Sequence, residues 1–287
     1  MKAAIPLLVG FLLAGCVSPQ APEEVAPSSQ PPVEESPEVF APGWPSLADA
    51  RIRPGIQIGT SSNPLSAVRP ISQCTANFLF RSLDNRSLYL GTAAHCVDDL
   101  AVGDSYPLLR GAASATVAYV SFHTMKEIGE TDRVARDDND FALLRIDDEH
   151  RLLAHPAMLH YGGPVALADS SSVGNGERVR FYGNSDLRQD ADPLSPHSGC
   201  VVNSNPWAIE FASPYPGIFG DSGSGALAAD GAALGVVITL RVGSGGTSNA
   251  LMRLDAALGY AREHAGVEVE LVTWESLSEL ALPEWPC

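Results

Sequence analysis

The chain has 287 residues, of which 45% are hydrophobic and 18% charged, so it holds enough apolar material for a folded core and is not a disordered protein. Its formal net charge is −16. A nucleic-acid-binding protein needs a basic face to neutralise phosphates, and adhesion to anionic lipid needs a basic patch, so this charge argues against both partners.

The first residues are typical of an export signal. Met1 and Lys2 give a short positive start, residues 3–13 are apolar but too short to span a bilayer comfortably, and small residues precede Cys16. The ending Leu13-Ala14-Gly15-Cys16 resembles a lipobox. The resemblance implies a lipoprotein signal peptide over residues 1–15, a lipid on the Cys16 thiol, and attachment to the extracytoplasmic side of a prokaryotic membrane. An ordinary signal peptide with an incidental cysteine is the alternative.

Residues 16–50 are predicted to form a lipid-anchored linker, because they are rich in Pro, Ser and Glu. With few apolar residues to offset the entropy of ordering, such a segment is expected to be an extended spacer. Trp44 interrupts its polarity and can dock on the folded domain, although a stray aromatic residue in a linker is the simpler interpretation.

Residues 51–287 are predicted to form a β-rich domain, because short apolar runs alternate there with Gly, Asn, Asp and Ser. The expected strands are 75–80, 87–91, 115–122, 141–146, 178–182, 208–211, 225–228 and 234–240. One helix is expected over residues 251–264, where Leu251, Leu254, Leu258 and Ala261 recur at helical spacing and Gly266 follows as a stop signal.

Four cysteines remain if Cys16 is lipidated, and four cysteines allow three pairings. Cys74 and Cys96 bracket a predicted hairpin and can be joined across it, which leaves Cys200 for Cys287. A free or intermolecular thiol at Cys287 is the alternative.

Three segments carry candidate chemistry. Residues 91–96 (Gly-Thr-Ala-Ala-His-Cys) place His95 after an apolar strand, residues 139–144 place Asp140 before one, and residues 220–225 (Gly-Asp-Ser-Gly-Ser-Gly) place Ser222 in a glycine-rich turn. Together, in the order His, Asp, Ser, they resemble the trypsin-like (chymotrypsin-fold) serine peptidases. The similarity covers roughly residues 52–266, and Cys74 stands where the family has the cysteine that bridges to the one after the catalytic His.

The resemblance implies an all-β protein of two packed six-stranded antiparallel β-barrels with a C-terminal α-helix and a boundary between the barrels near residues 160–175. The active site would lie in the cleft, with His95 and Asp140 from the first barrel and Ser222 from the second. The implied activity is that of a serine endopeptidase, which hydrolyses a protein or peptide substrate through an acyl-enzyme.

Each residue type suits that chemistry. A serine hydroxyl is a poor nucleophile at neutral pH, so Ser222 needs a base such as neutral His95, and a buried Asp140 would orient the imidazole. The backbone N–H groups of Gly220 and Ser222 would form the oxyanion hole. No metal or organic cofactor is required. An α/β-hydrolase is unlike this chain, because Ser224 replaces the second Gly of its motif and the order of the triad is reversed. A catalytically inactive surface lipoprotein that uses the fold as a binding module is the retained alternative.

The resemblance places Pro216, Ile238 and Thr239 in the specificity pocket. The trypsin branch of the family has an aspartate at the position of Pro216, and residues 213–217 contain no acid. A buried substrate cation would lack a partner there, so we expect no preference for Arg or Lys. Arg241 near the pocket wall could accept an acidic side chain.

Other polar residues are weaker candidates. His150, His155 and His160 recur without a matching carboxylate pattern and are expected at the surface rather than at a metal site. Asp137 and Asp138 could help to bind calcium, with a solvated acidic loop as the default. Cleavage after Arg51 would give Ile52 a free amine for Asp221, as in family zymogens. The favoured expectation is activity without that cut, with an internal side chain satisfying Asp221.

Overall fold

The computed structural model describes residues 43–59, 73–83, 87–188, 195–243, 246–275 and 287. Contacts divide the chain into residues 1–39 and 40–287, and every described residue belongs to the second unit. The predicted signal peptide, Cys16 and the linker as far as residue 42 lie outside the described residues. None of the described helices is long and apolar enough to cross a membrane.

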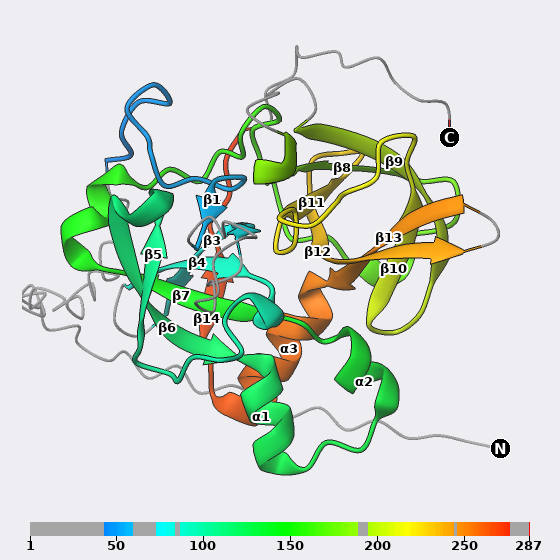
Figure 1. The fold of residues 1–287 in the computed structure, drawn as a ribbon, viewed down its shortest axis with the longest axis horizontal. Coiled ribbons are helices and arrows are strands. Elements are labelled where there is room, and N and C mark those ends of the chain that lie inside the picture. The colour runs from blue at the N-terminus through cyan, green and yellow to red at the C-terminus, as the bar shows by residue number, and fades with distance from the viewer. Residues whose placement is uncertain (1–42, 60–72, 84–86, 189–194, 244–245, 276–286) are drawn as a thin grey trace, which may run out of the picture. The chain divides into compact units, whose positions relative to one another are not determined.

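The first β unit of the domain, formed by strands before residue 147 and by β14 near the C-terminus, is one antiparallel sheet of eight strands in the order β14-β3-β4-β7-β6-β5-β1-β2 (Figure 1). The strands are β1 (Gln57–Ile58), β2 (Cys74–Thr75), β3 (Leu79–Ser82), β4 (Leu88–Thr92), β5 (Ser105–Leu108), β6 (Ala113–Val120), β7 (Ala142–Ile146) and β14 (Val269–Leu271). β2 ends one side of this order and β3 stands next to the other end, yet only residues 76–78 separate them in the chain. The sheet is therefore curled towards itself.

The second half is a closed barrel of six strands in the order β10-β13-β12-β11-β8-β9. They are β8 (Arg178–Tyr182), β9 (Pro196–Ser204), β10 (Ala208–Ala212), β11 (Gly225–Ala228), β12 (Ala233–Gly243) and β13 (Gly246–Arg253). Alternate residues of these strands point inwards, as in β8, where buried Val179 and Phe181 alternate with half-buried neighbours. The same alternation supplies a core that includes Phe211 and Leu251.

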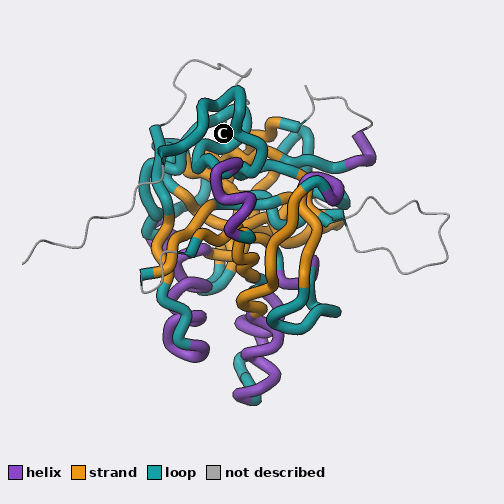
Figure 2. The backbone as a smooth tube through the Cα atoms, turned by 90° about the vertical axis from the view of Figure 1, so that its left-hand side faces the viewer, coloured by secondary structure: helices purple, strands orange, loops and turns teal. Residues whose placement is uncertain are grey.

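The three α-helices among the described residues lie outside the sheets (Figure 2). α1 (Ser121–Ile128) and α2 (Arg133–Asp138) form the connection from β6 to β7, and the Asp132 side chain accepts a hydrogen bond from Val134 N–H at the start of α2. α3 (Leu254–Ala265) ends at Gly266, whose φ of 63° is the left-handed conformation that favours glycine. Short 3₁₀ helices are η1 (Ala94–Cys96), η2 (Leu109–Gly111), η3 (Asp148–Leu153), η4 (Ser170–Ser172) and η5 (Asp186–Arg188).

The predicted fold class is confirmed: the domain is mainly β, with two β units and a C-terminal helix. The first unit differs in detail, because it is an eight-stranded curled sheet rather than a closed six-stranded barrel. The C-terminal helix begins at Leu254, since residues 251–253 still pair with β12 as the end of β13. Residues 121–122, predicted as strand, begin α1.

Two disulfides join the cysteines in the expected pairs, Cys74–Cys96 and Cys200–Cys287. The two cysteines of the first bond are separated by 22 positions in the sequence, and those of the second by 87. Such bonds are typical of proteins that fold outside the reducing cytosol.

Candidate active site

His95 and Asp140 are brought together by the pairing of β4 with β7. His95 lies in η1 just after β4, Asp140 lies just before β7, and Thr92 is paired with Ala142 in the ladder. His95 Nδ1 is 2.5 Å from Asp140 Oδ2, and the His95 backbone N–H donates to Asp140 Oδ1 at 2.9 Å. The carboxylate thus holds both the ring and the backbone of this histidine.

The environment of His95 suits a general base. Burial alone would lower the pKa of His95, but the hydrogen bond and the charge of Asp140, with a smaller contribution from Asp98, raise it above its ordinary value. Because the carboxylate accepts, Nδ1 carries the proton in the neutral ring. Nε2 is then the basic atom, and the side chain is 34% exposed while that of Asp140 is 8% exposed.

Ser222 lies in the turn between β10 and β11, against the first β unit. Its carbonyl oxygen accepts a hydrogen bond from Thr75 N–H at 2.8 Å and lies 4.0 Å from Cys96 Sγ. Since Cys96 follows His95 directly, these contacts hold the Ser222 backbone beside the histidine segment. The next residue, Gly223, has a φ of 90°, and a Cβ there would lie 2.3 Å from the Thr75 carbonyl oxygen. Only glycine allows this approach.

Within residues 220–224, the turn around Ser222 leaves two backbone donors available. Asp221 N–H donates to Ile218 O, and the N–H groups of the two residues after Ser222 donate to Val237 O and Asp221 O. By contrast, the N–H groups of Gly220 and Ser222 have no acceptor within the described residues. These are the two donors that the sequence suggested for an oxyanion hole, and the Thr75 hydroxyl holds the turn by donating to Gly220 O at 2.7 Å.

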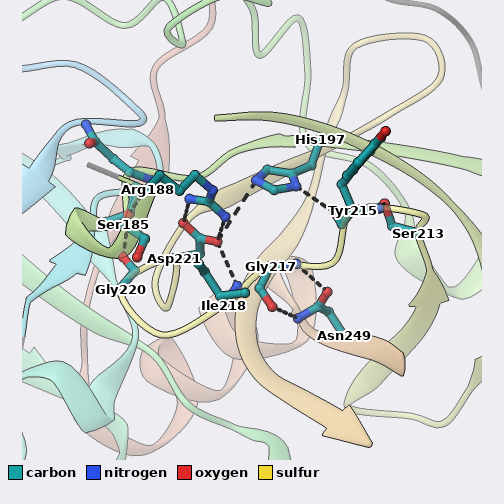
Figure 3. Close-up of polar contacts among 12 residues, drawn as sticks. Ser185, Arg188, His197, Ser213, Tyr215, Gly217, Ile218, Gly220, Asp221 and Asn249 are labelled. Atoms are coloured by element: carbon teal, nitrogen blue, oxygen red, sulfur yellow. Dashed lines mark hydrogen bonds and ion pairs between the residues drawn. The ribbon is translucent and has the colours of Figure 1, made fainter. Parts of the chain in front are cut away.

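Asp221 is fully buried and forms an ion pair with Arg188 of η5 (Figure 3). Arg188 Nη1 donates to Asp221 Oδ1 at 2.5 Å and Nη2 donates to Oδ2, while Ile218 N–H donates to Oδ2 at 2.8 Å. An internal side chain therefore compensates Asp221, and activity without a cut after Arg51 stays a prediction. Sequence reasoning did not identify Arg188, because no local motif surrounds it.

The residues predicted for the specificity pocket lie on two segments, 213–219 and β12, that Asn249 of β13 ties together. Asn249 Oδ1 accepts from Gly217 N–H at 2.8 Å, and its Nδ2 donates to Gly217 O at 3.0 Å and to Thr239 O at 3.2 Å. Gly217 follows Pro216 directly, and Thr239 follows Ile238, which is 7% exposed. Asn249 was missed, and its only signal is a single amide residue at the start of an apolar run.

Arg241 is held by two acidic residues of this chain. Its Nη2 lies 3.6 Å from Asp138 Oδ1 and its Nη1 lies 3.6 Å from Glu210 Oε2, while Asn205 donates to Asp138 Oδ2. Its charge is therefore partly balanced before any acidic substrate arrives, which disfavours the suggested role of Arg241.

His155 is only 2% exposed, so its expected surface position is wrong. Its ring lies 6.2 Å from that of Trp44 and 4.6 Å from that of Trp274, between centroids. Trp44 therefore packs on the domain instead of standing free. In the part of the chain that the structure describes, one group has metal-ligand spacing, Cys74, His95 and Cys96, and the disulfide occupies both of its sulfur atoms.

The chain is similar in its backbone to several solved structures of proteases. Thermobifida fusca protease A is 17% identical, with 77% of this chain and 98% of that chain covered and a TM-score of 0.49. A glutamic acid-specific serine protease described as utilising a novel histidine triad in substrate binding is 17% identical, with 76% and 100% covered and a TM-score of 0.49. Nocardiopsis protease is 14% identical, with 77% and 98% covered and a TM-score of 0.47. The sequence matches no family model and no curated protein.

Proposed function

We propose that the chain is a serine endopeptidase in which Ser222, His95 and Asp140 form the catalytic triad. The observation that supports it most directly is the contact of His95 Nδ1 with Asp140 Oδ2 at 2.5 Å, which leaves Nε2 as the basic atom of the ring. The Ser222 backbone lies beside Cys96, the residue after His95, and an imidazole held in this tautomer is the base that a serine hydroxyl needs.

In this mechanism Ser222 Oγ attacks the carbonyl carbon of the scissile peptide bond while His95 Nε2 takes the hydroxyl proton. Asp140 stabilises the imidazolium that forms. The N–H groups of Gly220 and Ser222 stabilise the negative charge that develops on the carbonyl oxygen. His95 then gives its proton to the leaving amine. A water molecule, activated by the same imidazole, hydrolyses the acyl-enzyme and restores Ser222.

The pocket chemistry supports a preference for small or apolar side chains over Arg or Lys. The predicted pocket residues Pro216, Ile238 and Thr239 include no carboxylate, and the Asn249 Oδ1 beside them already accepts a hydrogen bond from Gly217 N–H. A substrate cation buried there would lose its hydration without gaining a partner. Cleavage of a peptide library mainly after Arg or Lys would contradict this preference.

We further propose that the enzyme works outside the cytoplasm, tethered to a membrane through lipid on Cys16. The lipobox-like ending of the N-terminal segment supports the attachment, and the two disulfides support export. Incorporation of a radiolabelled fatty acid into the wild-type protein, and loss of that label in Cys16→Ser, would test this attachment.

Labelling with a fluorophosphonate probe tests the activity itself. We expect the full chain to be labelled and the Ser222→Ala variant not to be. Ser224→Ala is the matched control: its side chain lies two residues away in the same turn, is fully buried, and its Oγ has no hydrogen-bond partner among the described residues. Labelling that persists in Ser222→Ala would assign the reactive nucleophile to another residue. A folded wild-type chain that neither reacts nor cleaves peptides would favour the inactive binding module.

A further inference from the structure

His197 of β9 is a buried histidine that the triad does not use. It is 2% exposed, and its ring is stacked on that of Phe181 with 4.2 Å between centroids and 3° between planes. His197 Nδ1 is 2.7 Å from the Tyr215 carbonyl oxygen. Because a carbonyl oxygen only accepts hydrogen bonds, Nδ1 must carry the proton.

The other ring nitrogen of His197 faces the ion pair of Asp221. Nε2 lies 4.0 Å from Asp221 Oδ2 and has no hydrogen-bond partner within the described residues (Figure 3). In the neutral ring Nε2 presents a lone pair, so it cannot donate to the carboxylate. Asp221 Oδ2 is meanwhile satisfied by Arg188 Nη2 and by Ile218 N–H.

These two contacts join parts of the site that are separated in the chain. Tyr215 precedes Pro216 and Gly217, whose backbone is bonded to Asn249 at the pocket. Asp221 precedes Ser222 and, through Ile218 N–H, fixes the turn that carries the two available donors. A change at His197 therefore reaches both the pocket segment and the oxyanion turn.

The charges around His197 make a second positive charge costly. Arg188 from η5 and Asp221 from the turn are the charged groups that face it, and β8 contributes the uncharged Phe181 ring. Tyr161, on the side of its backbone, donates its hydroxyl hydrogen to the His197 carbonyl oxygen. Burial lowers the pKa of His197 below its ordinary value against the opposing effects of Asp221 and the Tyr215 carbonyl, and the charge of Arg188 lowers it further.

We propose that His197 is a positioning residue of the peptidase site and that it must be neutral for the oxyanion turn to hold its active arrangement. This inference rests on the proposed function. A proton on Nε2 turns a lone pair into a donor aimed at Asp221 Oδ2. That donor competes with Ile218 N–H for the oxygen and pulls the carboxylate towards β9, which loosens the turn on which Gly220 and Ser222 stand.

The proposal implies that two protonations, rather than one, lower kcat/KM at acid pH, that is, along the acid limb of its pH profile. His95 must be neutral to act as base, and its pKa lies above the ordinary value, whereas that of His197 lies below it. As the pH falls, kcat/KM should first drop about tenfold per pH unit and then, once His197 also binds a proton, about a hundredfold per unit.

The experiment compares kcat/KM against pH for the wild-type full chain, His197→Asn and His155→Asn. Asparagine at position 197 places an amide donor near the Tyr215 carbonyl oxygen and cannot titrate, so the limb should fall about tenfold per unit throughout. His155, another buried histidine, contacts Trp44 and Trp274 rather than the turn, so its variant should keep the steeper region. Rates are measured where activity returns fully on neutralisation, which separates titration from unfolding.

A second measurement covers the case in which His197→Asn does not fold. In Ser222→Ala labelled with ¹⁵N-histidine, the His197 resonances should show the Nδ1–H tautomer at neutral pH and titrate in the pH range where the wild type enters its steeper region. A wild-type limb of about tenfold per unit, a steep region that survives in His197→Asn, or a proton on Nε2 at neutral pH would each overturn the inference. A wild-type chain without peptidase activity would instead overturn the proposed function.

Discussion

The ion pair between Arg188 and Asp221 supplies the sharpest structural prediction, because it is a charge pair with almost no access to water. The side chains are 7% and 0% exposed, and both guanidinium donors of the pair reach the same carboxylate. Replacing Arg188 by Met keeps most of the side-chain volume and removes the cation. Asp221 would then keep only the Ile218 N–H at 2.8 Å as a donor among the described contacts.

The size of the loss follows from the burial of Asp221. Removing one partner of a buried ion pair leaves an uncompensated charge and costs about 3–5 kcal/mol. For a domain of this size that corresponds to a fall in Tm of ~6–20 °C. We also expect a loss of activity in protein that remains folded. Asp221 precedes the nucleophile, so a carboxylate that turns towards solvent would displace the N–H groups of the oxyanion hole.

Chemical denaturation of the wild-type and Arg188→Met proteins at neutral pH, followed by Trp fluorescence, measures the loss in the free energy of unfolding. Peptide hydrolysis by the two folded proteins measures the loss of activity.

Arg133→Met is the matched control, since Arg133 pairs with Asp137 at 3.5 Å but the two side chains are 90% and 63% exposed. That variant should leave stability and activity nearly unchanged, because an exposed pair gains little over water. If Arg188→Met were as stable and active as Arg133→Met, the idea that Arg188 holds the Ser222 turn in place would be wrong.

Three further predictions follow from the same structure. Removing the Cys200–Cys287 bond by changing both cysteines to serine should lower the free energy of unfolding by about 4–5 kcal/mol in the loop-entropy model, because their sequence separation is 87. An unchanged free energy of unfolding would refute the bond. Asp140→Asn should lower kcat by several orders of magnitude and move the acid limb to lower pH, because it removes the interactions that raise the pKa of His95; an unshifted limb would assign that limb to another group. Arg51→Gln, intact by mass spectrometry, should hydrolyse peptides as fast as wild type; activity only in a chain that begins at Ile52 would show that cutting is required.

Residues close to their own motif could be predicted from the sequence. His95, Asp140 and Ser222 each lie at a strand end or in a glycine-rich turn, so a few neighbouring letters mark them, and the structure places His95 and Asp140 in contact. Their roles remain a proposal.

Residues that act across the fold could not be predicted in this way. Arg188 is 33 residues from Asp221, and Asn249 is 32 residues from Gly217, so nothing local marks either partner. The family resemblance implied that an internal side chain satisfies Asp221, but it did not show which residue supplies that side chain.

The errors in the predicted elements have local causes. Leu251 fits the helical spacing of Leu254 and Leu258, yet it pairs with Val237 across the β12–β13 ladder, which ends only at Arg253. β9 was missed because Pro, Ser, Gly and Asn weaken its strand pattern, while its pairing with β8 and β10 within the closed barrel supplies the hydrogen bonds that hold it extended.

The contacts of Ile52 and Asp221 favour a site that is formed without a new N-terminus. Activation by cleavage after Arg51 would require Ile52 to leave its position and its amine to reach Asp221. Ile52 is fully buried, its N–H donates to Leu153 O at 2.9 Å, and its own carbonyl accepts from His155 N–H at 2.9 Å. The place beside Asp221 is meanwhile filled by Arg188, which already neutralises the carboxylate. Exchange would therefore break a buried backbone pairing and a buried ion pair to form one new ion pair, so the arrangement with Arg188 in place is the more stable one.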